Sequence, residues 1–373
     1  MKKTPLLYTA GPTAVPPQVL KAMSMPILNP DLDENFFELY DKLCNKIRKI
    51  AGTSNDLFIM AGEGMVGLDS AIANLVENKD QVLAISSGVF GDGFVDMVRN
   101  YGGKPVVVKE EYDNVVSPND IERALEKNNK INVATFVHCE TPSGTIAPLD
   151  QVGKVCNDHD VILVADTVST LGGTPLNVDK NQIDVCLGAS QKCFSAPPGL
   201  ATISVSKRAW EKIETRKQKV PSYYLNLMEW KNSWLGKRIF PYTQSVSDIF
   251  ALDTAVDLLL DEGLASVYRR HNKVAKLVRE RCHDIGIELF PISENISSPT
   301  VTALKVPKGI EELELRTLME RKYSVSIAGS WGKLSGKVIR LGHMGYNAYE
   351  MTAEIALEAL EKSLWKLGFR NSQ

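Results

Sequence analysis

Short apolar runs alternate with segments of helical spacing over the first 205 residues of the chain. The runs consist of apolar or β-branched residues almost throughout, which is typical of strands buried on both faces of a sheet. They lie at residues 57–60, 81–86, 105–109, 133–138, 161–165, 184–188 and 200–205. Segments between them, such as 118–126 and 149–158, have the spacing of amphipathic helices. This alternation predicts an α/β layered domain with a mainly parallel sheet.

The pattern changes after Pro241, where longer helical segments replace the regular alternation. Helices are predicted at 246–261, 263–285, 311–321 and 348–367. Strands are predicted near 288–291, 301–306 and 338–341. The proline-rich segment 5–30 predicts an extended arm, because proline removes a backbone donor and fixes φ. We therefore expect an N-terminal arm at 1–20, a large domain at 21–255 and a smaller α+β domain at 256–373.

Composition narrows the classes of partner and compartment. The net charge of −2 over 373 residues supplies no basic field that would attract nucleic acid or an anionic membrane. No uncharged apolar run reaches the roughly 18 residues that a membrane span needs. The six cysteines form no CxxC pair and no metal-like spacing with the five histidines. We expect reduced thiols, no metal site and a cytoplasmic protein.

Two residues in the predicted sheet could carry chemistry. Asp166 directly follows the apolar run 161–165, and the carboxyl ends of parallel strands are where open α/β sheets bind their ligands. An aspartate there can equally cap the turn that follows. Lys192 comes after an apolar strand and small residues, and Pro197-Pro-Gly199 fixes the backbone downstream. A lysine desolvated in this way has a lowered pKa and can attack a carbonyl, although most lysines simply lie at the surface.

A glycine-rich turn, Gly62-Glu-Gly64-Met-Val-Gly67, joins a predicted strand to a predicted helix. The free N–H groups of a helix start favour a phosphate, so the turn could serve a nucleotide-binding oxidoreductase. Asp80 is near the distance for a ribose ligand, but it precedes a strand, which argues against a dinucleotide site. A phosphate site, a carboxylate and a lysine are instead the minimum set for pyridoxal phosphate.

Several motifs together resemble the class V aminotransferases, and most closely the alanine–glyoxylate and serine–pyruvate branch. They are Thr9-Ala-Gly-Pro-Thr13, Glu140-Thr-Pro-Ser-Gly-Thr145, Asp166-Thr-Val-Ser-Thr170, Gly188-Ala-Ser-Gln-Lys192 with Ala196-Pro-Pro-Gly199, and Gly336-Lys-Val-Ile-Arg340. The resemblance implies pyridoxal phosphate fold type I, with a seven-stranded, mainly parallel sheet and a smaller C-terminal domain. It also implies a homodimer whose active sites lie at the interface.

The resemblance assigns roles to individual positions. Lys192 matches the lysine that holds the cofactor as a Schiff base, and Asp166 matches the partner of the pyridine nitrogen. The other implied cofactor contacts are Gly64, Met65 and Gln191 to the phosphate, Phe90 and Val168 to the two ring faces, Thr141 near the phenolic oxygen, and Thr243, with Tyr242 beside it, to the phosphate of the neighbouring subunit. Arg340 matches the arginine that binds the substrate's α-carboxylate, for which its planar fork is suited.

Three positions depart from the family pattern. Met65 stands where relatives often have histidine, Pro142 where they often have serine or threonine, and Glu63 where a small residue is usual. These changes leave the amino-acid pair open. His138 is read as a structural histidine, and His343 is given no catalytic role.

The predicted function is a ping-pong transamination from a small amino acid, alanine or serine, to glyoxylate or pyruvate. Alternatives within the family are (S)-ureidoglycine–glyoxylate transamination and a phosphonate or phosphoserine substrate. The phosphorylated substrates are disfavoured because no extra basic cluster accompanies Arg340. From other classes, the nucleotide-binding oxidoreductase and a binding protein that kept the cofactor but lost turnover also stay open.

Overall fold

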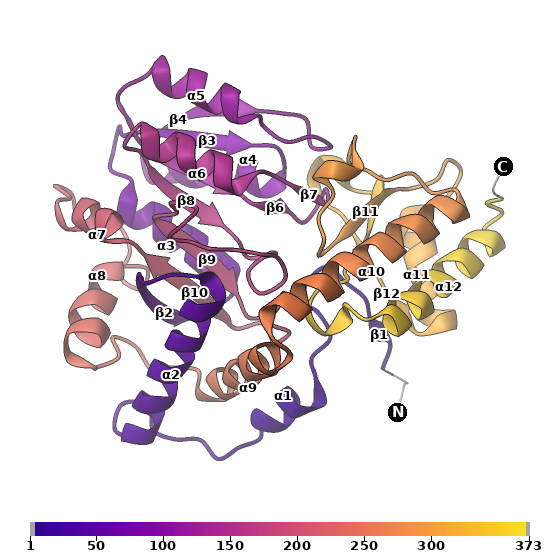
Figure 1. Ribbon diagram of the computed structural model, residues 1–373, viewed down its shortest axis with the longest axis horizontal. Coiled ribbons are helices and arrows are strands. Elements are labelled where there is room, and N and C mark those ends of the chain that lie inside the picture. The colour runs from indigo at the N-terminus through magenta and orange to yellow at the C-terminus, as the bar shows by residue number, and fades with distance from the viewer. Residues whose placement is uncertain (1–3, 371–373) are drawn as a thin grey trace.

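The computed structural model describes residues 4–370 and contains one large sheet with helices on both sides (Figure 1). Its strands are β2 (Asp56–Ala61), β3 (Gln81–Ser86), β4 (Lys104–Lys109), β5 (Ile131–Val137), β8 (Ile162–Asp166), β9 (Val185–Ala189) and β10 (Leu200–Val205). Their order is β2-β10-β9-β8-β5-β3-β4. Every pairing is parallel except those of β10, which is antiparallel to both neighbours. The expectation of a mainly parallel seven-stranded sheet is confirmed.

Burial explains which strands lie in the interior of this sheet. Every residue of β8, β9 and β10 is buried, so both faces of these strands are covered. Strand β4 is at one edge, and its terminal lysines, Lys104 and Lys109, are exposed. Charged ends and Pro105 on an edge strand discourage pairing with another chain. Asp166, at the end of β8, and Lys192, in the turn after β9, therefore lie at the buried centre of the sheet.

Helices of the large unit pack on both faces of the sheet. They are α2 (Glu34–Ala51), α3 (Gly64–Leu75), α4 (Val89–Asn100), α5 (Pro118–Glu126), α6 (Leu149–Asp158), α7 (Lys207–Glu214), α8 (Leu227–Trp230) and α9 (Val246–Glu262). In Figure 1, α5 and α6 lie in front of the sheet while α3 and α4 lie behind it. Helix α3 packs on β9 and β10 at Gly67, where a Cβ would lie 3.5 Å from Leu187 and 3.7 Å from Ala201, in ordinary van der Waals contact.

The C-terminal part forms a smaller unit, drawn in orange and yellow in Figure 1. A three-stranded antiparallel sheet has the order β11-β14-β13. Its elements are β11 (Thr302–Lys305), β13 (Ala328–Gly329), β14 (Val338–Leu341), α10 (Leu264–Ile285), α11 (Glu312–Tyr323) and α12 (Glu350–Lys366). The expected strand near 288–291 is wrong, because only Leu289 forms a bridge there, to Leu304.

The start of the chain packs against this C-terminal unit. Strand β1 (Leu6–Leu7) pairs in parallel with β12 (Val325–Ser326), and Tyr8 is buried in the second hydrophobic core. The expected extended arm is wrong over α1 (Pro17–Ala22), since a proline at the first helical position costs no hydrogen bond. After β1 the chain passes to the large sheet, where Ala10 and Thr13 form hydrogen bonds with Lys192 and Gln191.

The boundary between the two largest hydrophobic cores falls within α10. Val267 belongs to the core of the large unit, whereas Val274 belongs to the core of the C-terminal unit. The domain limits of 20 and 255 remain a prediction from the sequence. No helix among residues 4–370 is both long enough and apolar enough to cross a bilayer.

Candidate active site

A cavity of about 200 Å³ lies where β8 and β9 end and α3 begins. Its lining comprises Gly11, Pro12, Glu63, Gly64, Met65, Leu68, Phe90, Thr141, Asp166, Val168, Ser169, Gln191, Lys192 and Trp331. The cavity thus brings together eight of the eleven residues singled out by the sequence. Tyr242, Thr243 and Arg340 are not in its lining. A larger hollow of about 840 Å³ contains neither Lys192 nor Asp166.

Lys192 reaches the cavity from the turn after β9 and is only partly accessible. Its Nζ donates a hydrogen bond to the carbonyl of Ala10, at 2.7 Å. Desolvation by burial, together with the nearby charge of Arg340, lowers the pKa of Lys192 to about 8 against the opposing effect of Asp166. A substantial share of this amine is therefore neutral and nucleophilic at mildly alkaline pH.

Gly11 makes the approach to Lys192 possible. It adopts φ +102°, and a Cβ at this position would lie 2.5 Å from the lysine Nζ. Any other residue would both strain the backbone and displace the amine. The N-terminal arm therefore forms one wall of the cavity, which the spacing of sequence motifs did not indicate.

Asp166 is the last residue of β8 and is buried. Its Oδ1 accepts the N–H of Val168 at 2.9 Å. Burial raises the pKa of Asp166 to about 6; the Val168 N–H and the charge of Lys192 lower it, while the charge of Glu63 raises it. The group is thus mostly ionised at neutral pH, and a buried carboxylate can keep a ring nitrogen protonated.

Phe90 lines the cavity from the first turn of α4, where the Glu140 carboxyl group forms hydrogen bonds with the backbone. The side chain of Glu140 accepts the N–H of Phe90 at 3.1 Å and that of Gly91 at 2.6 Å. Burial raises the pKa of Glu140 to about 8, in spite of these two bonds. The Trp331 ring meets the Phe90 ring edge-on, with centroids 6.2 Å apart. Glu140 and Trp331 were not identified as site residues from the sequence.

Arg340 lies on β14, next to the cavity but not in its lining. Its Nε donates to the carbonyl of Gly329 at 2.7 Å, and its guanidinium lies 4.6 Å from the centre of the Trp331 ring. Burial, together with the charge of Arg316, lowers the pKa of Arg340 to about 10 against the opposing effect of Glu312. Trp331 thus contacts both the cavity and the cation beside it.

Thr141 and Ser169 add hydroxyl groups to the same wall. Their side chains are hydrogen-bonded to each other, and both residues are buried. The two histidines of interest lie outside the cavity lining. His138 bonds Thr170, and burial lowers its pKa to about 4. His343 bonds Thr302, and burial lowers its pKa to about 3, which suits packing rather than proton transfer.

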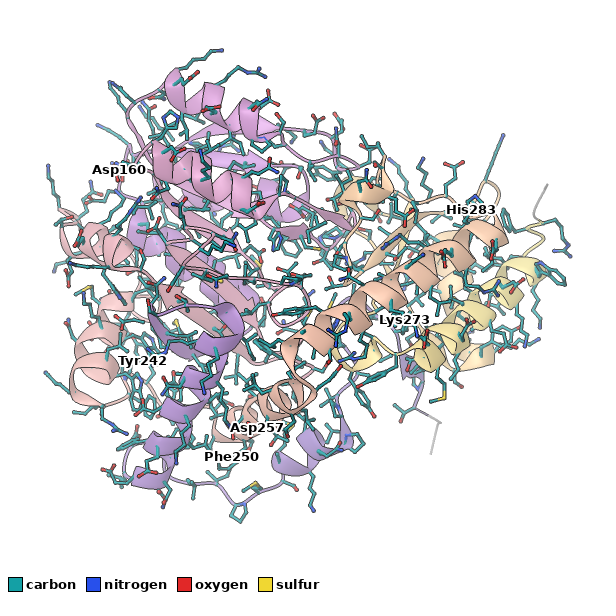
Figure 2. The ribbon with its side chains drawn as sticks, viewed as in Figure 1. Asp160, Tyr242, Phe250, Asp257, Lys273 and His283 are labelled. Carbon is teal, nitrogen blue, oxygen red and sulfur yellow. The ribbon has the colours of Figure 1, made fainter. Side chains whose placement is uncertain are left out.

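Tyr242 and Thr243 lie away from the cavity of their own chain. The Tyr242 hydroxyl donates to the carbonyl of Tyr223 at 2.6 Å, and Thr243 is exposed. Figure 2 shows Tyr242 at the edge of the large unit, near α8. A contact of Thr243 with the cavity of a neighbouring subunit stays a prediction.

At the start of α3, two of the three expected phosphate contacts, Met65 and Gln191, are engaged by a side chain of the protein. Glu63 caps the helix and accepts the N–H of Met65 at 3.1 Å. Its other carboxylate oxygen accepts the Gln191 Nε2 at 3.3 Å. Gly64 allows this turn to pack closely, because a Cβ there would be 3.1 Å from Val168.

Residues 6–340 match the family model for Aminotransferase class-V. The chain is a class V aminotransferase. It is 36% identical to the pyridoxamine–pyruvate transaminase of Mesorhizobium japonicum, over 95% of this chain and 90% of the relative. The ureidoglycine–glyoxylate aminotransferase of Bacillus subtilis superposes with a TM-score of 0.95 at 29% identity, covering 99% of this chain and 95% of that one. The alanine–glyoxylate aminotransferase of a Nostoc species gives a TM-score of 0.94 at 32% identity, with 98% and 96% covered.

Class V aminotransferases depend on pyridoxal phosphate, and the cavity of this family member fits the ring and carbonyl of that cofactor. Lys192 offers an amine of lowered pKa, and Asp166 offers a buried carboxylate to the ring nitrogen. Phe90 and Val168 offer apolar surfaces to the ring. The phosphate end instead carries the Glu63 carboxylate. Within residues 4–370 there is no group of three or more potential metal ligands.

The lowered pKa of Lys192 can be measured by its reaction with a small aldehyde and cyanoborohydride. Because the neutral amine is the nucleophile, the rate of Lys192 modification should rise with pH and level off above about 8. Peptide mass spectrometry would give this rate, with the exposed Lys207 as the internal comparison. A Lys192 rate that still climbs tenfold per pH unit above 9 would contradict the lowered pKa.

Glu140→Gln should weaken the fold, because the amide nitrogen of glutamine cannot accept one of the two N–H bonds; the loss should be about 1–3 kcal/mol.

The raised pKa of Glu140 also determines how its contribution to stability changes with pH. Between pH 4.5 and about 8 the Glu140 carboxyl is protonated more often in the folded than in the unfolded state. The contribution of Glu140 to the free energy of unfolding therefore falls as pH rises. The difference in unfolding free energy between wild type and Glu140→Gln should therefore shrink over that range. Denaturant titrations that run parallel at all pH values would contradict it, and Glu126→Gln on the exposed face of α5 is the control.

Proposed function

We propose that this enzyme moves an amino group from a small amino acid, alanine or serine, to glyoxylate or pyruvate by a ping-pong mechanism. The observation that carries the proposal is the pairing of an amine of lowered pKa, Lys192, with a buried carboxylate, Asp166, in one cavity. The relatives support the acceptors, since their names give glyoxylate or pyruvate. Their names differ in the amino donor, which is alanine, ureidoglycine or pyridoxamine.

The protonated pyridine ring and carbonyl of the B6 cofactor, when bound, would supply an electron sink that makes the α-proton of an amino acid acidic. In the proposed mechanism, the Lys192 Nζ takes that proton and returns it to the neighbouring carbon, acting as base and then as acid. Its hydrogen bond to the Ala10 carbonyl fixes the direction of the amine. Asp166 keeps a negative charge beside the ring nitrogen, and Phe90 excludes water from the ring face.

Arg340 is the proposed partner of the substrate's α-carboxylate. Its Nε is already fixed by the Gly329 carbonyl, so the remaining guanidinium N–H groups keep a defined direction. Trp331 packs on this guanidinium and on Phe90, and therefore limits the space next to the α-carbon. This restriction favours small side chains such as those of alanine and serine.

A phosphonate or phosphoserine donor is disfavoured by charge. Lys192 is the only cationic residue among the described residues that line the cavity. A second anionic group on the substrate would face Glu63 and Asp166 without a partner.

We further propose a homodimer in which Thr243 of one subunit reaches the cavity of the other. The exposure of Thr243 in the single chain leaves its hydroxyl accessible to a neighbour. A cytoplasmic location also remains a prediction, supported by six buried cysteines that are all free thiols.

Single-turnover mixing tests the proposed reaction. The cofactor-loaded enzyme is mixed with alanine, serine or glycine, then with glyoxylate or pyruvate, and the absorbance of the cofactor should change and return. Lys192→Ala should slow each half-reaction by about 10²–10⁴-fold, because the proton-transferring amine is lost. Lys207→Ala, at an exposed position, should leave both rates unchanged. An unchanged rate in Lys192→Ala would refute the assignment.

Arg340→Lys tests the carboxylate site. A lysine cannot reproduce the planar fork, so the KM for the amino acid should rise on the order of tenfold or more, with a smaller change in kcat. Arg370→Lys is the matched control, because Arg370 also packs on a tryptophan, Trp365, but away from the cavity. An equal KM in Arg340→Lys and wild type would assign Arg340 to packing alone.

A further inference from the structure

The Glu63 carboxylate occupies the place at the start of α3 where a phosphate would bind. One oxygen accepts the Met65 N–H at 3.1 Å, and the other accepts the Gln191 Nε2 at 3.3 Å. These are two of the donors that a phosphate at this helix start would use. A phosphate therefore has to displace the protein's own carboxylate before it can make these bonds.

Charge also disfavours a phosphate at this end of the cavity. A phosphate monoester carries nearly two negative charges at neutral pH, and it would lie beside Glu63. The only cationic side chain in the described lining, Lys192, donates its hydrogen bond to the Ala10 carbonyl and not to Glu63. Thr243, the residue expected from a neighbouring subunit, would add a hydroxyl but no positive charge. Like charges placed together without compensation reject a ligand strongly.

Gln191 gives an independent indication of what this end can bind. It is 6% exposed and lines the cavity, and its Nε2 is committed to Glu63 because a carboxylate can only accept. Its Oε1 has no hydrogen-bond partner among residues 4–370. An unpaired buried acceptor needs a donor. A hydroxyl group can supply one, whereas a fully ionised phosphate cannot.

We propose that this site binds the unphosphorylated forms, pyridoxamine and pyridoxal, as exchanging substrates, and that Glu63 rejects the phosphate while accepting a hydrogen bond from the 5′-hydroxyl group. The inference rests on the proposed function, since Lys192 and Asp166 keep their roles at the amine and ring nitrogen. It adds the aromatic amine pyridoxamine as an amino donor beside the small amino acid, which donates to pyridoxal in the reverse direction.

The net reaction balances with a 2-oxo acid as the second substrate. The C–N bond of the pyridoxamine aminomethyl group breaks, and a C–N bond forms at C2 of pyruvate or glyoxylate. The aminomethyl carbon is oxidised by two electrons to an aldehyde, and C2 of the oxo acid is reduced by the same two electrons. The carbonyl oxygen of the oxo acid is replaced by the amino group, and pyridoxal gains an oxygen by exchange through water. The products are pyridoxal and alanine or glycine.

Glu63 is exposed at the rim of the cavity, so its side chain could also turn outward and admit a phosphate. A binding comparison separates these two behaviours. The full-length protein, freed of any bound B6 compound by turnover and dialysis, is titrated with pyridoxal and with pyridoxal phosphate. The near-ultraviolet and visible absorbance reports each Kd. Wild type should bind pyridoxal tighter than pyridoxal phosphate on the order of tenfold or more.

Glu63→Ser and Glu63→Gln supply the decisive variants. Both remove the charge, so the preference should move toward pyridoxal phosphate and invert in Glu63→Ser, where the smaller side chain also frees the Met65 N–H. Glu311→Ser is the matched control, because the Glu311 carboxylate also caps its helix, α11, but lies outside the cavity. Wild type should also convert pyridoxamine and pyruvate to pyridoxal and alanine.

The outcomes separate this inference from the proposed function. Tighter binding of pyridoxal phosphate by wild type, or an unchanged preference in both Glu63 variants, overturns the role of Glu63 and leaves transamination intact. If neither compound gives an absorbance change that is lost in Lys192→Ala, the transaminase proposal itself fails.

Discussion

Burial of the Lys192 amine against the N-terminal arm is the constraint on which the rest of the site depends. The amine donates to the Ala10 carbonyl, and Gly11 alone allows the backbone to pass this close. The arm is held in place by the C-terminal unit, through the pairing of β1 with β12 and the burial of Tyr8. The reactive lysine follows a strand of the large sheet, so the low-dielectric environment that lowers its pKa exists only when both hydrophobic cores have formed. Folding of the whole chain is thereby coupled to the chemistry of one amine.

The sequence predicted the parts of the fold that depend on local periodicity. Strands β3, β10 and β14 were placed at their observed limits, because continuous apolar runs between turns identify interior strands. Asp166 and Lys192 could be singled out because each follows such a strand. The sequence-based predictions were wrong where tertiary contacts determine the secondary structure. The short helix α1 forms in a proline-rich arm, and residues 288–291 have too few partners for a strand.

The site residues missed by sequence reasoning share a physical reason. Glu140 acts on Phe90 across fifty positions, and Trp331 joins the cavity only through the packing of a loop from the C-terminal unit. Neither has a distinguishing spacing in the chain. A signal existed for Glu140 alone, since a carboxyl group in a run of small and apolar residues has to be paired or protonated when buried. For Arg340, the residue type indicated a carboxylate-binding role from the sequence. Its packing on Trp331, which lines the cavity while Arg340 does not, depends on tertiary contacts that the sequence does not reveal.

The charges around the cavity explain why one substitution at the start of α3 can change the ligand without disturbing the fold. A helix start needs an acceptor for its free N–H groups, and this need is met equally by a bound anion or by a side chain at the cap. In this chain Glu63 provides the acceptor, so α3 is complete before any ligand arrives. A serine there would still cap the helix, and the free energy of unfolding would change little. What changes is the charge presented to the ligand, and that charge also acts on Asp166, whose pKa Glu63 helps to raise. The same carboxylate therefore links the choice of 5′ substituent to the protonation of the group that faces the ring nitrogen.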